Sequence, residues 1–329
     1  MTEALFIGLD LGGTEVKVGL GERDGTLVWD DRQPSNARKG GEAILAALGE
    51  AGDRALAEAK SLGRPVAALG LGTPGVIDAG TGRIRYPVAN LGGWCGTDLR
   101  GFFRDRFGLP AVIENDANAA GWGEYRGGAG RGAHTMVMTT VGTGIGGGAV
   151  IEGQLVRGAN GGGMELGHTL LKAGGRACHC GLAGCVEAYA GGRSMADEWG
   201  RRAAKQGIPL DHEVGGDGPQ LPDLLRADRA GDALAAEVLD EGARALGAGL
   251  VSALHLLNPD VLVLGGGILA GRPRQRELAI EAIELSILPK AWEELRVVEA
   301  ECGNRAGMIG AVCLAADLSE NGTDNGGVQ

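Results

Sequence analysis

The sequence has few aromatic side chains and little positive charge. Phe, Trp and Tyr make up 4% of the residues, so a hydrophobic core has to consist mainly of aliphatic side chains and alanine. The formal net charge is −11. That charge argues against a nucleic-acid partner, because such a partner needs a basic surface. It does not exclude a polyanionic ligand such as ATP, whose charge backbone donors and a metal ion can offset locally.

Long apolar runs are also missing. No run approaches the roughly 20 apolar residues of a membrane span, and the first residues, Met-Thr-Glu-Ala-Leu-Phe, lack the basic start of a signal peptide. We therefore expect a cytoplasmic protein with no membrane partner. The chain has six cysteines in 329 residues, too few for a disulfide scaffold.

Glycine, in contrast, is abundant, with 63 residues. A pattern of strand, Gly-Thr turn, strand, glycine turn and strand covers residues 4–29 and recurs over residues 135–157. Helices are predicted at residues 41–61, 98–107, 231–257, 273–287 and 307–318. The alternation of strands and helices predicts an α/β fold with parallel strand pairing, and the repeat predicts a duplicated β-meander that opens each of two domains.

Three glycine segments are candidate phosphate or nucleotide sites. Glycines let backbone N–H groups approach phosphate oxygens, and an aspartate at a strand end can hold magnesium. Tight hairpins and a helix-start turn are the structural alternatives. The segments are Asp10-Leu11-Gly12-Gly13-Thr14, Gly142-Thr143-Gly144 and, as an adenosine pocket after a buried strand, Gly265-Gly266-Gly267.

A carboxylate at the join of a strand and a helix is the candidate general base. Asp116 lies in the segment Glu114-Asn115-Asp116-Ala117-Asn118. Phosphoryl transfer to a sugar needs a carboxylate that accepts the hydroxyl proton. The alternative is that Asp116 is the helix N-cap, and the residues alone allow both roles.

Four potential metal ligands are spaced as H-x9-C-x-C-x4-C. They are His168, Cys178, Cys180 and Cys185, a set that fits a closed tetrahedral zinc site with a structural role. Buried free cysteines are the alternative. His179 lies between two of the ligands and is expected to point away from the metal. Glu165 and Glu187 flank the cluster and are expected to lie beside the metal as hydrogen-bond acceptors for a sugar, the alternative being solvated surface glutamates.

These motifs together resemble the ROK family (repressors, open reading frames and sugar kinases). The resemblance rests on the Asp10–Thr14, Glu114–Asn118 and Gly142–Gly148 segments, on Glu165-Leu166-Gly167-His168, and on the cysteine segment 178–187, and it runs from about residue 5 to about residue 318. It implies an actin-like, hexokinase-type (ribonuclease H-like) fold, in which two α/β domains surround a cleft, and commonly a homodimer.

The resemblance also implies roles for residues. Asp116 is then the base that takes the proton from the sugar 6-hydroxyl. The sugar-binding residues are Gly75, Asn90, Asn115, Asp116, Glu165, His168 and Glu187. Residues for ATP and Mg²⁺ are Asp10, Gly12, Gly13, Thr14, Lys17, Gly142, Thr143, Gly144 and Gly265–Gly267. His168 is expected to place one ring nitrogen on zinc and the other on the sugar.

The expected activity is an ATP-dependent hexose kinase, with glucose favoured as the sugar. The segment Asn90-Leu91-Gly92-Gly93-Trp94 resembles the loop of glucokinase-like members. The segment Gly161-Gly162-Gly163-Met164-Glu165 departs from the commoner Ala-Gly-Glu, so other acceptors stay open: N-acetylmannosamine, N-acetylglucosamine, mannose, fructose or allose. A sugar sensor without catalysis is the alternative of another class.

The expected domain organisation follows from the motif order. A smaller N-terminal domain covers residues 1–117 and is joined by the C-terminal helix at 306–318. A larger domain with the zinc site covers residues 118–305. The polar residues 319–329 are expected to form a disordered tail.

Overall fold

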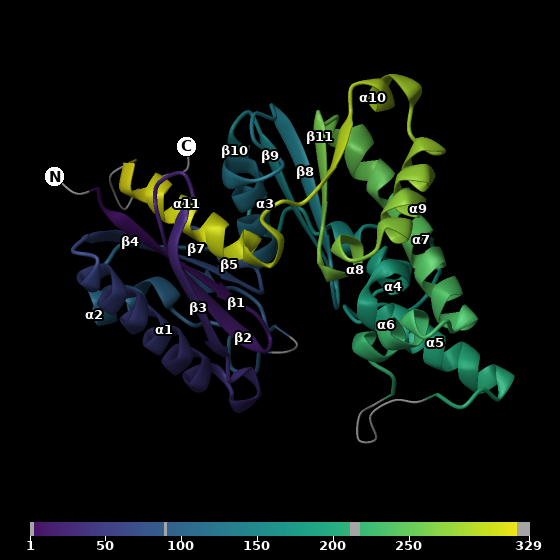
Figure 1. The fold of residues 1–329 in the computed structure, drawn as a ribbon, viewed down its shortest axis with the longest axis horizontal. Helices are drawn as coiled ribbons and strands as arrows, with labels where there is room; N and C mark the ends of the chain where they lie inside the picture. Colours follow the sequence, from purple (N-terminus) through teal and green to yellow (C-terminus); the bar gives the residue numbers. More distant parts are fainter. Residues whose placement is uncertain (1–2, 89–90, 211–217, 321–329) are drawn as a thin grey trace. The chain divides into compact units, whose positions relative to one another are not determined.

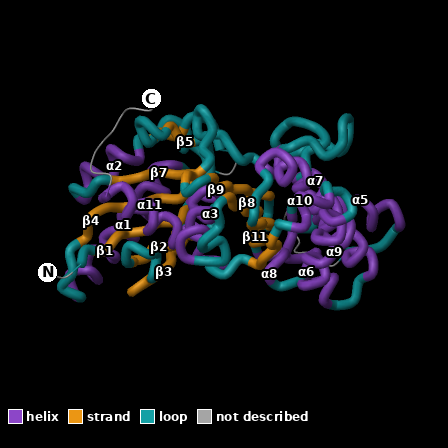
Figure 2. Tube along the Cα trace, turned by 90° about the horizontal axis from the view of Figure 1, so that it is seen from above, coloured by secondary structure: helices purple, strands orange, loops and turns teal. Residues whose placement is uncertain are grey.

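The computed structural model describes residues 3–88, 91–210 and 218–320. By its internal contacts the chain divides into two compact units (Figures 1 and 2). Unit 1 consists of Met1–Met136, Gly148–Met164 and Glu301–Gln329, and unit 2 of Val137–Gly147 and Glu165–Ala300. The domain boundaries expected from the sequence, at residues 117 and 305, are not decided by this grouping and stay predictions. The expected tail lies largely in residues 321–329, outside the described residues.

Unit 1 contains a five-stranded sheet with strand order β3-β2-β1-β4-β7. β1, β2 and β3 form an antiparallel meander, whereas β4 pairs in parallel with β1 and β7 pairs in parallel with β4. The strands are β1 (Leu5–Leu11), β2 (Glu15–Gly21), β3 (Leu27–Pro34), β4 (Val66–Thr73), β7 (Ala111–Asn115) and the small pair β5 (Ile77–Asp78) and β6 (Arg83–Ile84). The helices are η1 (Ala37–Lys39), α1 (Gly41–Ser61), α2 (Leu99–Phe107), α3 (Asp116–Gly127), η3 (Gly303–Arg305) and α11 (Ala306–Glu320).

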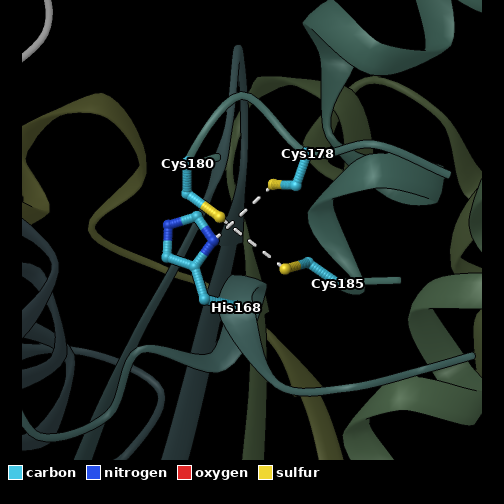
Figure 3. Close-up of side chains that lie close together, drawn as sticks. All are labelled: His168, Cys178, Cys180 and Cys185. Carbon is cyan, nitrogen blue, oxygen red and sulfur yellow. Dashed lines mark hydrogen bonds between the residues drawn. The ribbon is translucent and has the colours of Figure 1, made fainter. Parts of the chain in front are cut away.

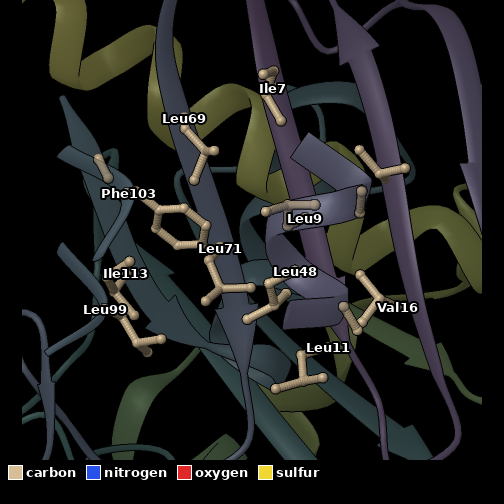
Figure 4. Packing of buried hydrophobic residues seen from close by; sticks show 14 of the residues in the cluster. Ile7, Leu9, Leu11, Val16, Leu48, Leu69, Leu71, Leu99, Phe103 and Ile113 are labelled. Carbon is tan, nitrogen blue, oxygen red and sulfur yellow. The ribbon is translucent and has the colours of Figure 1, made fainter. Parts of the chain in front are cut away.

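Helices cover both faces of this sheet. Side chains alternate between the faces of a strand, so Ile7 and Leu9 face a core that includes Leu48 of α1 and Phe103 of α2 (Figure 4). Phe6 faces the other way, toward α11. There the helix lies almost on the sheet backbone, because a Cβ on Gly70 would stand 2.0 Å from the carbonyl oxygen of Ala311. Any larger residue at position 70 would push α11 away.

A second five-stranded sheet has the order β10-β9-β8-β11-β12. Its strands are β8 (Thr135–Val141), β9 (Ile145–Ile151), β10 (Gln154–Leu155), β11 (Val261–Gly265) and β12 (Arg296–Glu299), of which β8 and β9 contribute residues to both units. The helices of unit 2 are η2 (Leu166–His168), α4 (Glu187–Ala190), α5 (Gly192–Gln206), α6 (Leu221–Arg229), α7 (Ala233–Leu257), α8 (Gly267–Ala270), α9 (Pro273–Glu284) and α10 (Pro289–Glu293).

The two sheets share one topology. In each, a three-stranded meander is followed by two further strands that add beside its first strand. The duplicated meander predicted from the sequence is therefore confirmed, with β10 shorter than the predicted residues 154–157. In the described part of the chain, no helix combines the length and the apolar character needed to span a membrane.

Candidate active site and metal-binding cluster

Three neighbouring parallel strands of unit 1 bring predicted site residues to one edge of the sheet. In register, Asp10 of β1 lies beside Gly72 of β4, and Gly72 lies beside Glu114 of β7. Gly75 follows the end of β4, and Asp116 follows the end of β7. The carboxyl ends of parallel strands in open α/β sheets are where ligands bind. The predicted base, the predicted magnesium ligand and one predicted sugar-binding segment thus share this edge.

Asn115 connects the end of β7 to two neighbouring segments. Its Oδ1 accepts hydrogen bonds from the backbone N–H groups of Ala117 and Asn118, at 2.9 and 3.1 Å, so Asn115 is the N-cap of α3. Its Nδ2 donates to the carbonyl oxygen of Gly75 at 3.2 Å. The alternative in which Asp116 serves as the N-cap is therefore wrong. Asp116 is the first residue of the helix, where the positive end of the helix dipole favours an ionised carboxylate.

Asp10 has close neighbours on β2 and at the start of α11. Lys17, its cross-strand neighbour on β2, places its ammonium 3.0 Å from Asp10 Oδ2. The same ammonium donates to Asn304 Oδ1 at 3.4 Å. A Cβ on Gly307, at the start of α11, would lie 2.9 Å from the Asp10 carboxylate. The turn that follows is short, with Gly12 N–H donating to the Glu15 carbonyl at 2.8 Å, and leaves Gly13 and Thr14 exposed.

The predicted sugar residue Asn90 lies outside the described residues. The chain that follows it is fixed by Trp94, which is fully buried and donates from Nε1 to Thr73 Oγ1 at 3.1 Å. Trp94 therefore anchors residues 91–94 to the end of β4.

In unit 2 the other two glycine segments lie at neighbouring strand ends. The Gly142–Gly144 turn joins β8 to β9, and the segment Gly265–Gly267 begins at the last residue of β11, the strand beside β8. A Cβ on Gly266 would stand 2.2 Å from the backbone nitrogen of Val141. The start of α5 also reaches the turn, because Gly192 N–H donates to the Gly142 carbonyl at 3.0 Å. The structure thus brings the predicted phosphate turn and the predicted adenosine segment together.

The four predicted metal ligands gather in one place (Figure 3). Their ligand atoms all lie within 4.8 Å of one another. Cys178 Sγ is 3.9 Å from His168 Nδ1, and Cys180 Sγ is 3.8 Å from Cys185 Sγ. A tetrahedral zinc with Zn–S bonds of about 2.3 Å needs sulfur–sulfur distances of about 3.8 Å. The donor set and its spacing therefore fit zinc. Burial raises the pKa of the Cys178 thiol to about 12.

The residues around the cluster are arranged unequally. Glu187, at the start of α4, has its Oε1 4.0 Å from Cys178 Sγ, whereas Glu165 precedes η2 and is exposed. His179 points away from the cluster as predicted, with Nε2 3.0 Å from Asp197 Oδ2. Both glutamates were expected to lie beside the metal. Among the described contacts, Glu187 alone directly contacts a cysteine of the cluster.

One ion pair near the candidate base could not be found from the sequence. Glu114 is 4% exposed, and its Oε2 accepts a hydrogen bond from Arg157 Nε at 2.6 Å. Glu114 belongs to a recognised motif, but nothing in the sequence around Arg157 indicates this partner, which lies 43 residues away.

Comparisons with known proteins show which family the chain resembles. A family model described as the ROK family matches residues 6–318. A glucokinase from Halalkalibacterium halodurans is 33% identical, and the match covers 99% of each chain. Among solved structures, a ROK hexokinase from Thermus thermophilus has a TM-score of 0.82 and 35% identity, covering 97% of this chain and 100% of that one. A ROK family glucokinase from Streptomyces griseus, in complex with glucose and AMPPNP, has a TM-score of 0.77 and 34% identity, covering 95% of this chain and 100% of that one.

Proposed function

The chain belongs to the ROK family, and from this premise we propose that it is an ATP-dependent hexose kinase whose acceptor is glucose. Its fold is the actin-like, hexokinase-type α/β fold, as the sequence motifs implied. The reaction transfers the γ-phosphoryl group of ATP to a sugar hydroxyl, giving glucose 6-phosphate and ADP.

The observation that carries the proposal is the shared sheet edge of unit 1. Three parallel neighbours deliver Asp10, the Gly75 segment and the Asn115–Asp116 pair to that edge. A phosphoryl transferase needs one carboxylate for magnesium and another for the hydroxyl proton. Asp10 and Asp116 stand at the ends of strands that are separated by one strand, so about 10 Å of sheet lies between them. This spacing leaves room for a transferred phosphoryl group.

In the proposed mechanism Asp116 is the general base. Its carboxylate accepts the proton of the sugar 6-hydroxyl as that oxygen attacks the γ-phosphorus. Its place in the first turn of α3 supports the ionised state that a base needs. Asn115 is proposed to orient the sugar, and its bond to Gly75 supports a role in fixing the segment after β4.

ATP is proposed to bind through the glycine segments and Asp10. Backbone N–H groups of the Gly12–Thr14 and Gly142–Gly144 turns are suited to phosphate oxygens, and Gly265–Gly267 to the adenosine. Asp10 would hold Mg²⁺ or its water shell, and Lys17 would hold Asp10 and add positive charge. When bound, magnesium neutralises charge on the phosphates.

The cluster of His168 and three cysteines is proposed to hold a structural zinc ion. Its four protein ligands leave no open coordination position, so the metal would organise the loop rather than react. His168 Nδ1 faces the cluster, which leaves Nε2 for a sugar hydroxyl. Glu165 and Glu187 are proposed to accept hydrogen bonds from further hydroxyls. We also propose a homodimer in the cytoplasm, as the family resemblance implies.

A coupled assay of the purified protein tests the function. With MgATP we expect kcat/KM to be highest for glucose in a panel with mannose, fructose, allose, N-acetylglucosamine and N-acetylmannosamine. A higher kcat/KM for an N-acetylhexosamine would favour the alternative acceptor, which Met164 beside the sugar-binding segment keeps open. Glucose binding without phosphorylation of any hexose would indicate a sugar sensor and contradict the kinase function.

A further inference from the structure

The ion pair between Glu114 and Arg157 holds the segment that carries the proposed base. Glu114 immediately precedes Asn115, and its Oε1 accepts from the Asn115 backbone N–H at 3.0 Å. The same Oε1 accepts from Asn118 Nδ2 at 3.1 Å. The other polar atom of this side chain, Asn118 Oδ1, is buried and has no hydrogen-bond partner within the described structure. The bond from Nδ2 to Glu114 therefore fixes the Asn118 side chain. One buried carboxylate therefore ties together both sides of Asp116.

That carboxylate needs a countercharge. Glu114 is 4% exposed, and burying an unpaired carboxylate is costly. Arg157 supplies the charge through Nε at 2.6 Å from Oε2, leaving Oε1 for Asn115 and Asn118. The arginine side chain is 36% exposed, so it bridges the buried motif and the surface loop to which it belongs.

The loop that carries Arg157 is itself fixed. Gly163 N–H donates to the Arg157 carbonyl at 2.9 Å and closes residues 157–163 into a compact turn. Gly161, at φ +82°, packs so closely that a Cβ would stand 2.2 Å from the Ile77 carbonyl oxygen. Ile77 lies two residues beyond Gly75, which accepts from Asn115 Nδ2. The loop, the segment after β4 and the start of α3 thus form one closed set of contacts.

We infer that Arg157 is a positioning residue for phosphoryl transfer. Through Glu114 it holds Asn115 and Asp116 in the arrangement that catalysis needs, and it links them to the loop that leads into Met164 and Glu165. The inference rests on the proposed kinase function. It assigns Arg157 no contact with the substrate.

The variant Arg157→Met keeps much of the side-chain length and removes the charge. We expect kcat to fall by about tenfold or more, because small misplacements of reacting groups have large effects on rate. The KM for ATP should change by less than about twofold, because the ion pair touches none of the proposed ATP-binding residues. Arg157→Lys should recover part of the loss. Arg104→Met is the matched control, since Arg104 pairs with its exposed neighbour Asp105, and its kcat should equal that of the wild type.

The double variant Arg157→Met with Glu114→Gln guards against misfolding, because it leaves no buried charge unpaired. It should fold, with kcat no lower than that of Arg157→Met, since both changes remove one interaction. A double variant or an Arg157→Met variant that turns over within about twofold of the wild-type rate contradicts the inference.

A readout without turnover separates this inference from the proposed function. Hydrogen–deuterium exchange of peptides covering residues 111–120 should be faster in Arg157→Met than in the wild type and unchanged in Arg104→Met. Unchanged exchange in Arg157→Met overturns the positioning role even if the wild type phosphorylates no sugar. A wild-type protein that phosphorylates no hexose, with faster exchange in Arg157→Met, contradicts the kinase function alone.

Discussion

Glu187 accepts a hydrogen bond from the backbone N–H of Ile145, with 2.7 Å between the nitrogen and Oε2. Its other oxygen faces Cys178 Sγ at 4.0 Å. One side chain therefore touches both the cluster of His168 and three cysteines and the first residue of β9, directly after the Gly142–Gly144 turn. Glu187 thus connects the cluster with the proposed phosphate turn. In the sequence motifs these two features look like separate sites.

The first prediction concerns Gly144. A Cβ at this position would lie 2.6 Å from Glu187 Oε2, so Gly144→Ala has to move the carboxylate or the turn. We expect kcat/KM for glucose to fall by about ten- to a hundredfold, because the proposed sugar-binding Glu187 and the proposed phosphate turn are displaced together. Steady-state kinetics and thermal melting measure the effect. Gly271→Ala is the control, since its Cβ would meet nothing closer than 4.0 Å. Equal activity of the two variants would contradict the coupling.

Much of this architecture can be read from sequence periodicity. The long helices α1 and α7 and the doubled meander follow from apolar spacing and glycine turns, and all were predicted. The helix α5 was missed, because it starts at two glycines and has no side-chain cap. Pairs of Glu198 with Arg201 and Arg202 support it instead, and they hold the pKa of Glu198 down to about 2.

The candidate site residues could be proposed from the sequence because their motifs are local. The contacts between them were not, because Glu187 meets Ile145 across 42 residues and Arg157 meets Glu114 across 43. Such pairs depend on how turns and strand ends pack together, and no local pattern specifies that packing.

A second prediction tests the base. Asp116→Asn keeps the size of the side chain and removes its ability to accept a proton, so kcat should fall by about a hundredfold or more. The Kd for glucose should change little, since the amide can still form hydrogen bonds. Turnover by coupled assay and binding by calorimetry separate the two effects. Asp105→Asn, at an exposed position in α2, should behave as the wild type. Near-normal turnover of Asp116→Asn would show that another group takes the proton.

A third prediction tests the metal. Elemental analysis should find about one zinc per chain in the wild type. Cys178→Ser should lose the metal and lower the Tm, because the loop around residues 178–185 then lacks the ion that joins its ends. Cys95→Ser is the matched control, since Cys95 is exposed and lies outside the cluster. Chelation should reproduce the Cys178→Ser effect in the wild type and change nothing further in that variant. A metal-free wild type with an unchanged Tm would exclude a structural zinc.

A final prediction concerns Met164, which stands immediately before Glu165. Its φ is +63°, in the left-handed region that glycine adopts easily and other residues adopt at a cost of about 1–2 kcal/mol. Met164→Gly removes this cost of the left-handed backbone. The glycine also adds entropy to the unfolded chain, which offsets about 0.4–1 kcal/mol of the gain, so the Tm should stay the same or rise. Met164→Val should lower the stability by about 1 kcal/mol or more, because a β-branched residue tolerates this region poorly. The control is Glu50→Gly, at an exposed position inside α1. In contrast to Met164→Gly, it should lower the stability by about 1 kcal/mol. If Met164→Gly and Glu50→Gly lower the Tm equally, the backbone at residue 164 is not left-handed in solution. If instead the predicted order holds, the protein retains a strained methionine next to its proposed sugar-binding segment, and kinetics of Met164→Gly across the hexose panel will show whether that methionine selects the sugar.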